Sequence, residues 1–171
     1  MPLDAATAPP RFSLLDEALI RWRCVTRGDL HCSSLPELLA AMVVDSVRDF
    51  PALRPHQRHP LHAFLAQLAA ITLHHAGQDE PWTDPADWRA ALLALTPDDP
   101  DGAAWCLVAP PERPALLQPP VPGECVHDWK NVLHAADELD MLVTSKNHDL
   151  KAARAHRADP DDWLFALVSL Q

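Results

Sequence analysis

Glycine is scarce in this sequence, and the glycine-dependent motifs of common catalytic sites are missing. Only four glycines occur in 171 residues, beside 18 prolines. There is no G-x-S-x-G nucleophile elbow, no G-x-x-x-x-G-K-[ST] phosphate loop, no G-x-G-x-x-G turn and no H-E-x-x-H zinc motif. We therefore predict a protein that is not an enzyme and needs no cofactor. A hydrolase that uses a histidine and carboxylates is an alternative, but no motif supports it.

Signals for export and membrane insertion are missing as well. The first ten residues, M-P-L-D-A-A-T-A-P-P, contain neither the basic nor the apolar part of a secretory signal. No apolar run approaches the roughly 18 residues of a transmembrane helix. We expect a cytoplasmic protein without a membrane partner. Its reduced cysteines would be Cys24, Cys32, Cys106 and Cys125.

Hydrophobic residues are plentiful, at 48% of the chain, which is enough to bury a core. The many prolines favour short helices joined by stiff connectors, because proline fixes φ and ends helices. We predict an α+β fold that is predominantly α-helical, with a small N-terminal β-hairpin. Residues 1–10 are expected to form a disordered tail. Residues 11–171 are expected to be the N-terminal part of a larger fold, because the final W-L-F-A-L-V-S-L-Q is an apolar helix without a stop signal.

The predicted hairpin lies near the start of the chain. Polar and apolar residues alternate from Leu19 to Val25, as they do in a half-buried strand. Arg27, Gly28 and Asp29 suit a turn, and residues 30–32 suit a short returning strand.

Helix signals follow the hairpin. Ser34 and Glu37 have the S-x-x-E spacing of a capping box, which predicts a helix over about 35–45. Residues 50–60 contain three prolines and are expected to be an extended connector. Apolar residues then recur at steps of three and four over 61–77, where the closing glycine is typical of a helix end.

Two later helices begin with nearly the same phrase. D-P-A-D-W at 84–88 and D-P-D-D-W at 159–163 each place an aspartate at the cap, proline in the first turn and tryptophan on the apolar face. The acidic pairs at 98–99 and 161–162 are interpreted as turn or capping residues for the same reason. A further helix is predicted over about 127–136. The six tryptophans are interpreted as core or interface anchors.

Two clusters with histidine suggest a metal site as an alternative. The first consists of Cys24, His31 and Cys32, and the second of His56, His59 and His62. The first lacks the C-x2-C knuckle of common zinc modules. In the second, Pro60 is expected to interrupt the helix that would align the histidines. We therefore predict no metal site.

Positive charge gathers in one stretch of an otherwise acidic chain. The stretch T-S-K-N-H-D-L-K-A-A-R-A-H-R at 144–157 holds four basic residues and a single acid, whereas the whole chain has a net charge of −10. Lys151, Arg154 and Arg157 would share one side of a helix. Cations and amide donors together suit phosphate, although such a run alone is more often a solvated face. A second, weaker basic patch consists of Arg54, His56, Arg58 and His59.

The order of several motifs resembles the start of a known family. The motifs are F-S-L-L-D-E at 12–17, S-L-P-E-L-L at 34–39, L-H-A-F-L-A-Q-L-A-A-I at 61–71, R-P-A-L-L-Q at 113–118, and D-M-L-V-T-S-K-N-H-D at 140–149 ahead of the final apolar segment. Together they are similar to the N-terminal portion of the CasA family, the large subunit of the type I-E CRISPR surveillance complex Cascade.

The resemblance implies a non-catalytic subunit in antiviral defence. Its partners would be the other Cascade subunits, the guide RNA, target double-stranded DNA and the helicase-nuclease that the family recruits. It would help to recognise the protospacer-adjacent motif in the DNA. The segment at 142–155 resembles a family loop that reaches the 5′ handle of the guide RNA. The residues expected to bind nucleic acid are Lys146, Asn147, His148, Lys151 and Arg154.

The sequence also departs from the family pattern. Residues 18–21 stand where the family has an aromatic residue and proline. The loop has Lys146 and Arg154 in place of an aromatic residue and glycines, so charge would replace stacking. The alternative is a protein-interaction module without direct nucleic-acid contact, in which the basic stretch is a salt-bridged surface helix.

Overall fold

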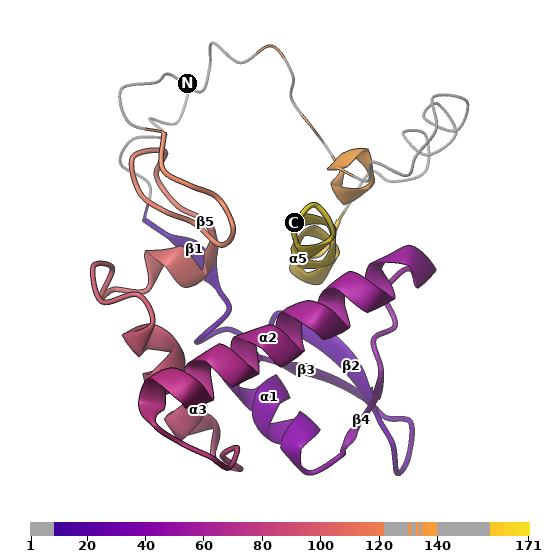
Figure 1. Cartoon of the computed structure of the whole chain (residues 1–171). Coiled ribbons are helices and arrows are strands. Elements are labelled where there is room, and N and C mark those ends of the chain that lie inside the picture. The colour runs from indigo at the N-terminus through magenta and orange to yellow at the C-terminus, as the bar shows by residue number, and fades with distance from the viewer. Residues whose placement is uncertain (1–8, 122–129, 131–132, 134, 140–157) are drawn as a thin grey trace.

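The computed structural model describes residues 9–121, 130, 133, 135–139 and 158–171 (Figure 1). The fold is α+β with an N-terminal hairpin, as the sequence predicts. The strands are β1 (Arg11–Ser13), β2 (Ile20–Cys24), β3 (Leu30–Ser33), β4 (Val47–Asp49) and β5 (Cys106–Val108). The helices are α1 (Leu35–Val43), α2 (Arg58–Ala76), α3 (Pro85–Ala94) and α5 (Pro160–Ser169), with short 3-10 turns η2 (Pro55–Gln57), η3 (Ala103–Trp105) and η5 (Ala136–Leu139). Within the described residues, no helix is long and apolar enough to span a bilayer.

Two small antiparallel sheets carry the strands. The first has the order β3-β2-β4, and the register Ile20↔Ser33 sets its hairpin. The turn of this hairpin contains Gly28 at φ 70°, a conformation that glycine adopts without steric cost. The hairpin prediction is therefore confirmed. The second sheet pairs β1 with β5, from Arg11↔Val108 to Ser13↔Cys106, and local sequence patterns did not predict it.

Helix α1 begins where the capping box predicts. The backbone N–H of Ser34 donates to the Glu37 carboxylate at 2.7 Å, which satisfies a group that the helix itself leaves free. The helix ends at Val43, two residues before the predicted end, and Asp45 follows with φ 52°. Aspartate tolerates this left-handed conformation better than most residues, which lets the chain turn directly into β4.

The extended connector predicted for 50–60 is wrong in its second half. Residues 55–57 form η2, and α2 begins at Arg58, so that Pro60 is the third residue of the helix. Proline is tolerated there because the first helical N–H groups have no acceptor within the helix. Pro60 therefore does not separate His59 from His62, which lie on the same helix.

The other helix ends follow their predicted capping chemistry. Gly77 closes α2 at φ 65°, and the Asp84 side chain accepts from the Ala86 N–H at 2.8 Å at the start of α3. At α5 the Asp162 carboxylate accepts from the Asp159 N–H at 2.9 Å. Most of the helix predicted over 127–136 and most of the expected tail over 1–10 lie outside the described residues. Residues 130, 133 and 135 are described and are not helical, and η5 begins at Ala136.

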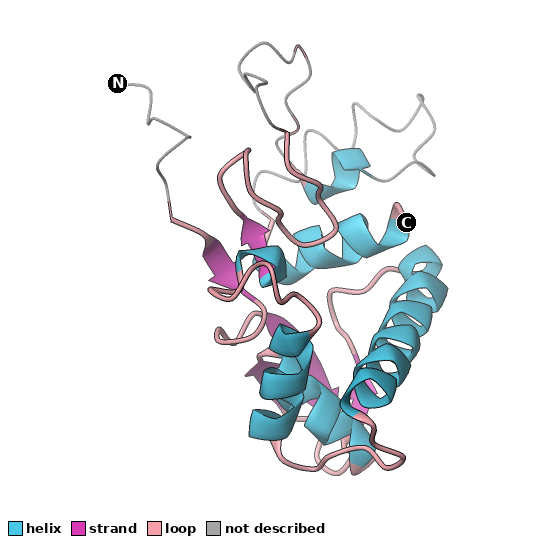
Figure 2. Cartoon of the chain, turned by 60° about the vertical axis from the view of Figure 1, so that its left-hand side comes forward, coloured by secondary structure: helices cyan, strands magenta, loops and turns pink. Residues whose placement is uncertain are grey.

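The core forms where the helices meet the three-stranded sheet. Helix α3 contacts both α1 and α2, and α5 contacts α2 and β2 (Figures 1 and 2). Trp22, Trp88 and Trp105 are buried, and Trp82 packs edge-to-face on Trp88 with 5.1 Å between ring centroids. These tryptophans act as core anchors, as predicted. The fully buried members of the core include Leu14, Ile20, Leu35, Leu38, Trp88, Leu92 and Phe165.

Candidate functional site

The residues predicted to bind nucleic acid lie outside the described part of the chain. They are Lys146, Asn147, His148, Lys151 and Arg154. The described residues that flank this part of the chain are Leu139, which ends η5, and Ala158, which lies just before α5. Both line the same apolar groove. The two described residues that flank 140–157 therefore lie at one place on the described body.

This apolar groove is lined by residues of β1 and β5 and by residues of α5. Figure 1 shows where these elements lie in the fold. Its volume is about 900 Å³, within the size range of ligand sites, which is roughly 300–1,000 Å³. Its lining is formed by Phe12, Leu107, Val108, Gln118, Leu133, Leu139, Ala158, Pro160, Trp163 and Leu167. Sequence reasoning missed it, although Trp163 and Leu167 are four residues apart on one face of α5.

The groove leaves large apolar side chains in contact with solvent. Phe12, Val108 and Leu133 are 39%, 37% and 43% exposed. Phe12 also has φ 60°, which costs a non-glycine residue about 1–3 kcal/mol. Among the described residues of the lining Gln118 is the polar one, and its amide nitrogen donates to the carbonyls of Leu107 at 3.1 Å and Leu116 at 3.3 Å.

An ion-pair cluster fixes the N-terminus of α5 beside the groove. Arg21 on β2 donates from Nε to Asp161 Oδ2 at 2.8 Å and from Nη2 to Oδ1 at 2.7 Å. Its Nη1 lies 2.6 Å from the Asp159 carboxylate. The Asp161 side chain is fully buried, and its Oδ2 also accepts from the backbone N–H of Arg21 at 3.3 Å. The capping interpretation of residues 161–162 is therefore right for Asp162 but does not describe Asp161.

In this cluster one cation, Arg21, lies among the carboxylates of three aspartates, and this arrangement shifts pKa values. The hydrogen bonds to Asp161 raise the pKa of Arg21 above its usual value. Burial raises the pKa of Asp162. The three aspartates bring ligand atoms within 4.8 Å of one another, the only such group of potential metal ligands among the described residues. The guanidinium of Arg21 already supplies a cation to these oxygens, so a metal ion is not required for their proximity.

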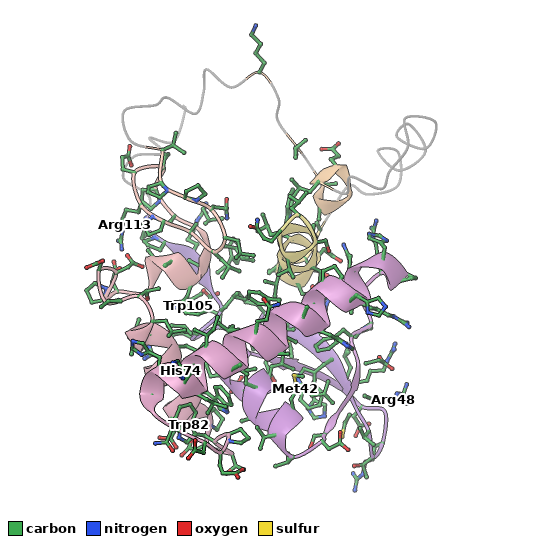
Figure 3. All side chains as sticks on the ribbon, viewed as in Figure 1. Met42, Arg48, His74, Trp82, Trp105 and Arg113 are labelled. Carbon is green, nitrogen blue, oxygen red and sulfur yellow. The ribbon has the colours of Figure 1, made fainter. Side chains whose placement is uncertain are left out.

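A second arginine holds the loop after β5. Arg113 Nη1 donates to Asp101 Oδ2 at 2.6 Å, and Nη2 contacts the carboxylates of both Asp99 and Asp101. Asp99 also accepts from the backbone N–H of Ala104, which ties this pair to η3. Hydrogen bonding to Arg113 lowers the pKa of Asp101 to about 2. Figure 3 shows Arg113 above Trp105, on the side of the molecule that carries β1 and β5.

Other arginines of the described body are also engaged by carboxylates. Arg23 and Arg48 bind Asp49 at 3.1 and 3.0 Å, and Arg89 binds Asp16 at 2.7 Å. With the two clusters above, five described arginines are in ion pairs. In the second basic patch, Arg58 and His59 are exposed at the start of α2.

The zinc alternative finds no support in the described geometry. His31 stacks on Trp22 with 4.6 Å between ring centroids. The Cys32 thiol donates to the Ala18 carbonyl at 2.9 Å. The described cysteines, Cys24, Cys32 and Cys106, are free thiols. Among the described residues, Cys24, His31 and Cys32 are not a group whose ligand atoms lie together.

Comparison of the chain with protein-family models, with curated proteins and with solved structures gives no match. The resemblance to the CasA family therefore rests on the order of the sequence motifs and stays a prediction. The described geometry adds an apolar groove and two arginine–aspartate clusters, and none of these includes a nucleophile paired with a base.

Replacing Arg21 with methionine should lower the free energy of unfolding by about 3 kcal/mol, because Asp161 would remain buried without its partner. Chemical denaturation measures the change. Arg23→Met is the matched control, since Arg23 pairs with Asp49 on the exposed surface, where such a pair contributes less than about 1 kcal/mol. Equal losses in the two variants would contradict a special role for Arg21.

Replacing Arg113 with glutamine should raise the pKa of Asp101 from about 2 toward its ordinary value of 3.8. A carboxyl whose pKa is lowered by folding stabilises the fold above its unfolded pKa, and this contribution is lost as the pH falls toward 2. The stability difference between wild type and Arg113→Gln should therefore shrink between pH 4 and pH 2. Carboxyl NMR titration gives the pKa directly. The control Arg89→Gln removes a different ion pair and should leave the pKa of Asp101 unchanged.

Proposed function

We propose that this chain is the N-terminal part of a non-catalytic Cascade large subunit, in which the basic stretch at 144–157 contacts nucleic acid. In this role the chain assembles with other Cascade subunits in the cytoplasm. It contacts the 5′ handle of the guide RNA and contributes to target DNA recognition and helicase-nuclease recruitment. The contact residues are Lys146, Asn147, His148, Lys151 and Arg154. The order of the family-like motifs supports the assignment, and the distribution of charge supports the location of the contact.

The observation that carries the proposal is that many arginines of the described body form ion pairs within the chain, whereas the sequence leaves the basic stretch with few acids. Five of its arginines are bound by carboxylates of the same chain, as described above. An arginine that already pairs with a carboxylate has much of its charge balanced, so it attracts phosphate less strongly than an unbalanced cation does. The stretch at 144–157, in contrast, has four basic residues and one acid. It is therefore the segment in which the sequence offers the most positive charge to a phosphate backbone.

The attachment of this stretch favours a local and oriented contact. Leu139 and Ala158, which flank 140–157, both lie at the apolar groove. The net charge of the chain is −10 even with the basic stretch included, so the chain as a whole repels phosphate. A nucleic acid would therefore meet the chain on the side of the groove.

The protein-interaction module remains the second candidate function, and the apolar groove is the observation that favours it. Exposed apolar patches of this kind mark protein interaction sites. The two candidates differ in their response to salt. Binding through phosphates weakens steeply with salt concentration, whereas apolar docking does not.

The test is binding of a fluorescent RNA with the guide 5′ handle, followed by anisotropy over a range of salt concentrations. Wild type should bind, and Lys146/Lys151/Arg154→Ala should bind more weakly. The slope of log K against log salt should fall by about 2 in the variant, because each single-stranded phosphate contact contributes about 0.7.

The control is Arg23/Arg48/Arg89→Ala, which removes the same amount of charge from arginines that are bound by carboxylates. It should bind RNA like wild type. An equal loss in both triple variants would show that net charge alone determines binding. Absence of RNA binding by wild type would contradict the contact and leave the interaction module as the function.

A further inference from the structure

We infer that a hollow beside the start of α2 binds a free nucleotide whose base carries an amino group. Its lining includes Met42 near the end of α1, Asp45 between α1 and β4, and Arg58 and His62 on α2. Among their described residues, this hollow and the apolar groove have no lining residue in common. The inference therefore goes beyond the proposed function.

The hollow is large enough for a small ligand, and part of its lining is apolar. Its volume is about 320 Å³, and ligand sites begin at roughly 300 Å³. The apolar residues of the lining are Met42, Val47, Phe50 and Leu53. Met42 is 40% exposed, so a flat ligand group that covers it would remove apolar surface from water. A nucleobase is a ligand group of this shape.

The ionisable residues of the lining are of two kinds. Arg48 and Asp49 bind each other, because Arg48 Nε donates to Asp49 Oδ2 at 3.0 Å, and much of their charge is thereby balanced. The others are Arg58, His62 and Asp45, and all three are exposed. Within the described part of the chain, none of these three forms a side-chain ion pair or hydrogen bond. They are therefore available to a ligand.

Arg58 and His62 favour a phosphate group. They lie four residues apart on α2, which places them on the same face of the helix, and both line the hollow. A guanidinium can donate to two phosphate oxygens at once, and an imidazole adds a further N–H donor. The two side chains can therefore bind a phosphate without losing a partner in the protein.

The carboxylate of Asp45 selects a ligand that also carries a hydrogen-bond donor. It would repel a simple anion such as inorganic phosphate, whereas an amino group on a base would donate to it. An amino-bearing nucleotide supplies all the required parts. Its phosphate suits Arg58 and His62, its flat base suits the apolar lining, and its amino group suits Asp45.

The net charge of the chain favours a free nucleotide over a nucleic-acid strand at this hollow. The chain carries a charge of −10, and a strand has a phosphate at every nucleotide. Every phosphate that lies outside the hollow would be repelled by the acidic body. A single nucleotide places its only phosphate beside the two basic residues.

The test is isothermal titration calorimetry of the full chain with AMP and two analogues. Adenosine lacks the phosphate of AMP, and purine riboside 5′-monophosphate lacks only its amino group. AMP should bind about tenfold more tightly than either analogue, because each analogue leaves a charged side chain of the hollow without its partner.

Two variants assign these preferences to residues. Arg58→Gln should reduce the preference for AMP over adenosine from about tenfold to about twofold, since it removes the main cation. Glutamine is a good helix former, so the variant should keep α2. Asp45→Gly should abolish the preference for AMP over the analogue without the amino group. Glycine adopts the φ of 52° at this position without steric cost.

Arg27→Gln is the matched control, since Arg27 is an exposed arginine that does not line the hollow. It should bind all three ligands like wild type. Circular dichroism should show that the three variants are folded.

Several outcomes would overturn the inference. These are the absence of AMP binding by wild type, equal affinity for AMP and both analogues, and equal losses in Arg58→Gln and Arg27→Gln. Tighter binding of pentaadenylate than of AMP would overturn the choice of a free nucleotide over a strand. Lys146/Lys151/Arg154→Ala should bind AMP like wild type, so failure of the RNA proposal and failure of this inference are separate results.

Discussion

The contact between Arg21 and Asp161 determines how the two ends of the described chain come together. It joins β2 to α5 across 140 positions of sequence through two guanidinium hydrogen bonds of 2.7 and 2.8 Å. The carboxylate of Asp161 is fully buried, and a buried charge is tolerated only with such complete pairing. Helix α5 forms one wall of the apolar groove and follows the basic stretch directly. The placement of this groove wall therefore depends on the ion pair.

The two candidate surfaces, the apolar groove and the basic stretch at 144–157, differ in chemistry. Several arginines of the described body are bound by aspartates of the same chain, and the body also presents an apolar groove. The basic stretch at 144–157 holds positive charge that the sequence does not balance locally. In the proposed function the basic stretch would act on RNA, and in the second candidate function the groove would act on a protein partner. Neither requires a catalytic residue.

Local features were predictable from the sequence, and contacts between distant segments were not. The capping box at Ser34 and the helix end at Gly77 depend on residues within a few positions, and both are confirmed. The β1–β5 pairing joins three-residue strands more than 90 positions apart, which no local pattern indicates. The ion pair of Asp161 was not predictable either. Its local sequence is typical of a helix cap, and only the fold shows that Arg21 lies beside it. The groove was missed because four separate segments form it.

The most direct test of the central role of this ion pair is hydrogen exchange of the backbone amides in wild type and in Arg21→Met. Amides protected by local contacts report the stability of each element separately. If Arg21 and Asp161 hold α5 against β2, the amides of α5 should lose more protection than those of α1 and α3. Unchanged protection of α5 in Arg21→Met would contradict the account, because the groove wall would then be held by apolar packing alone.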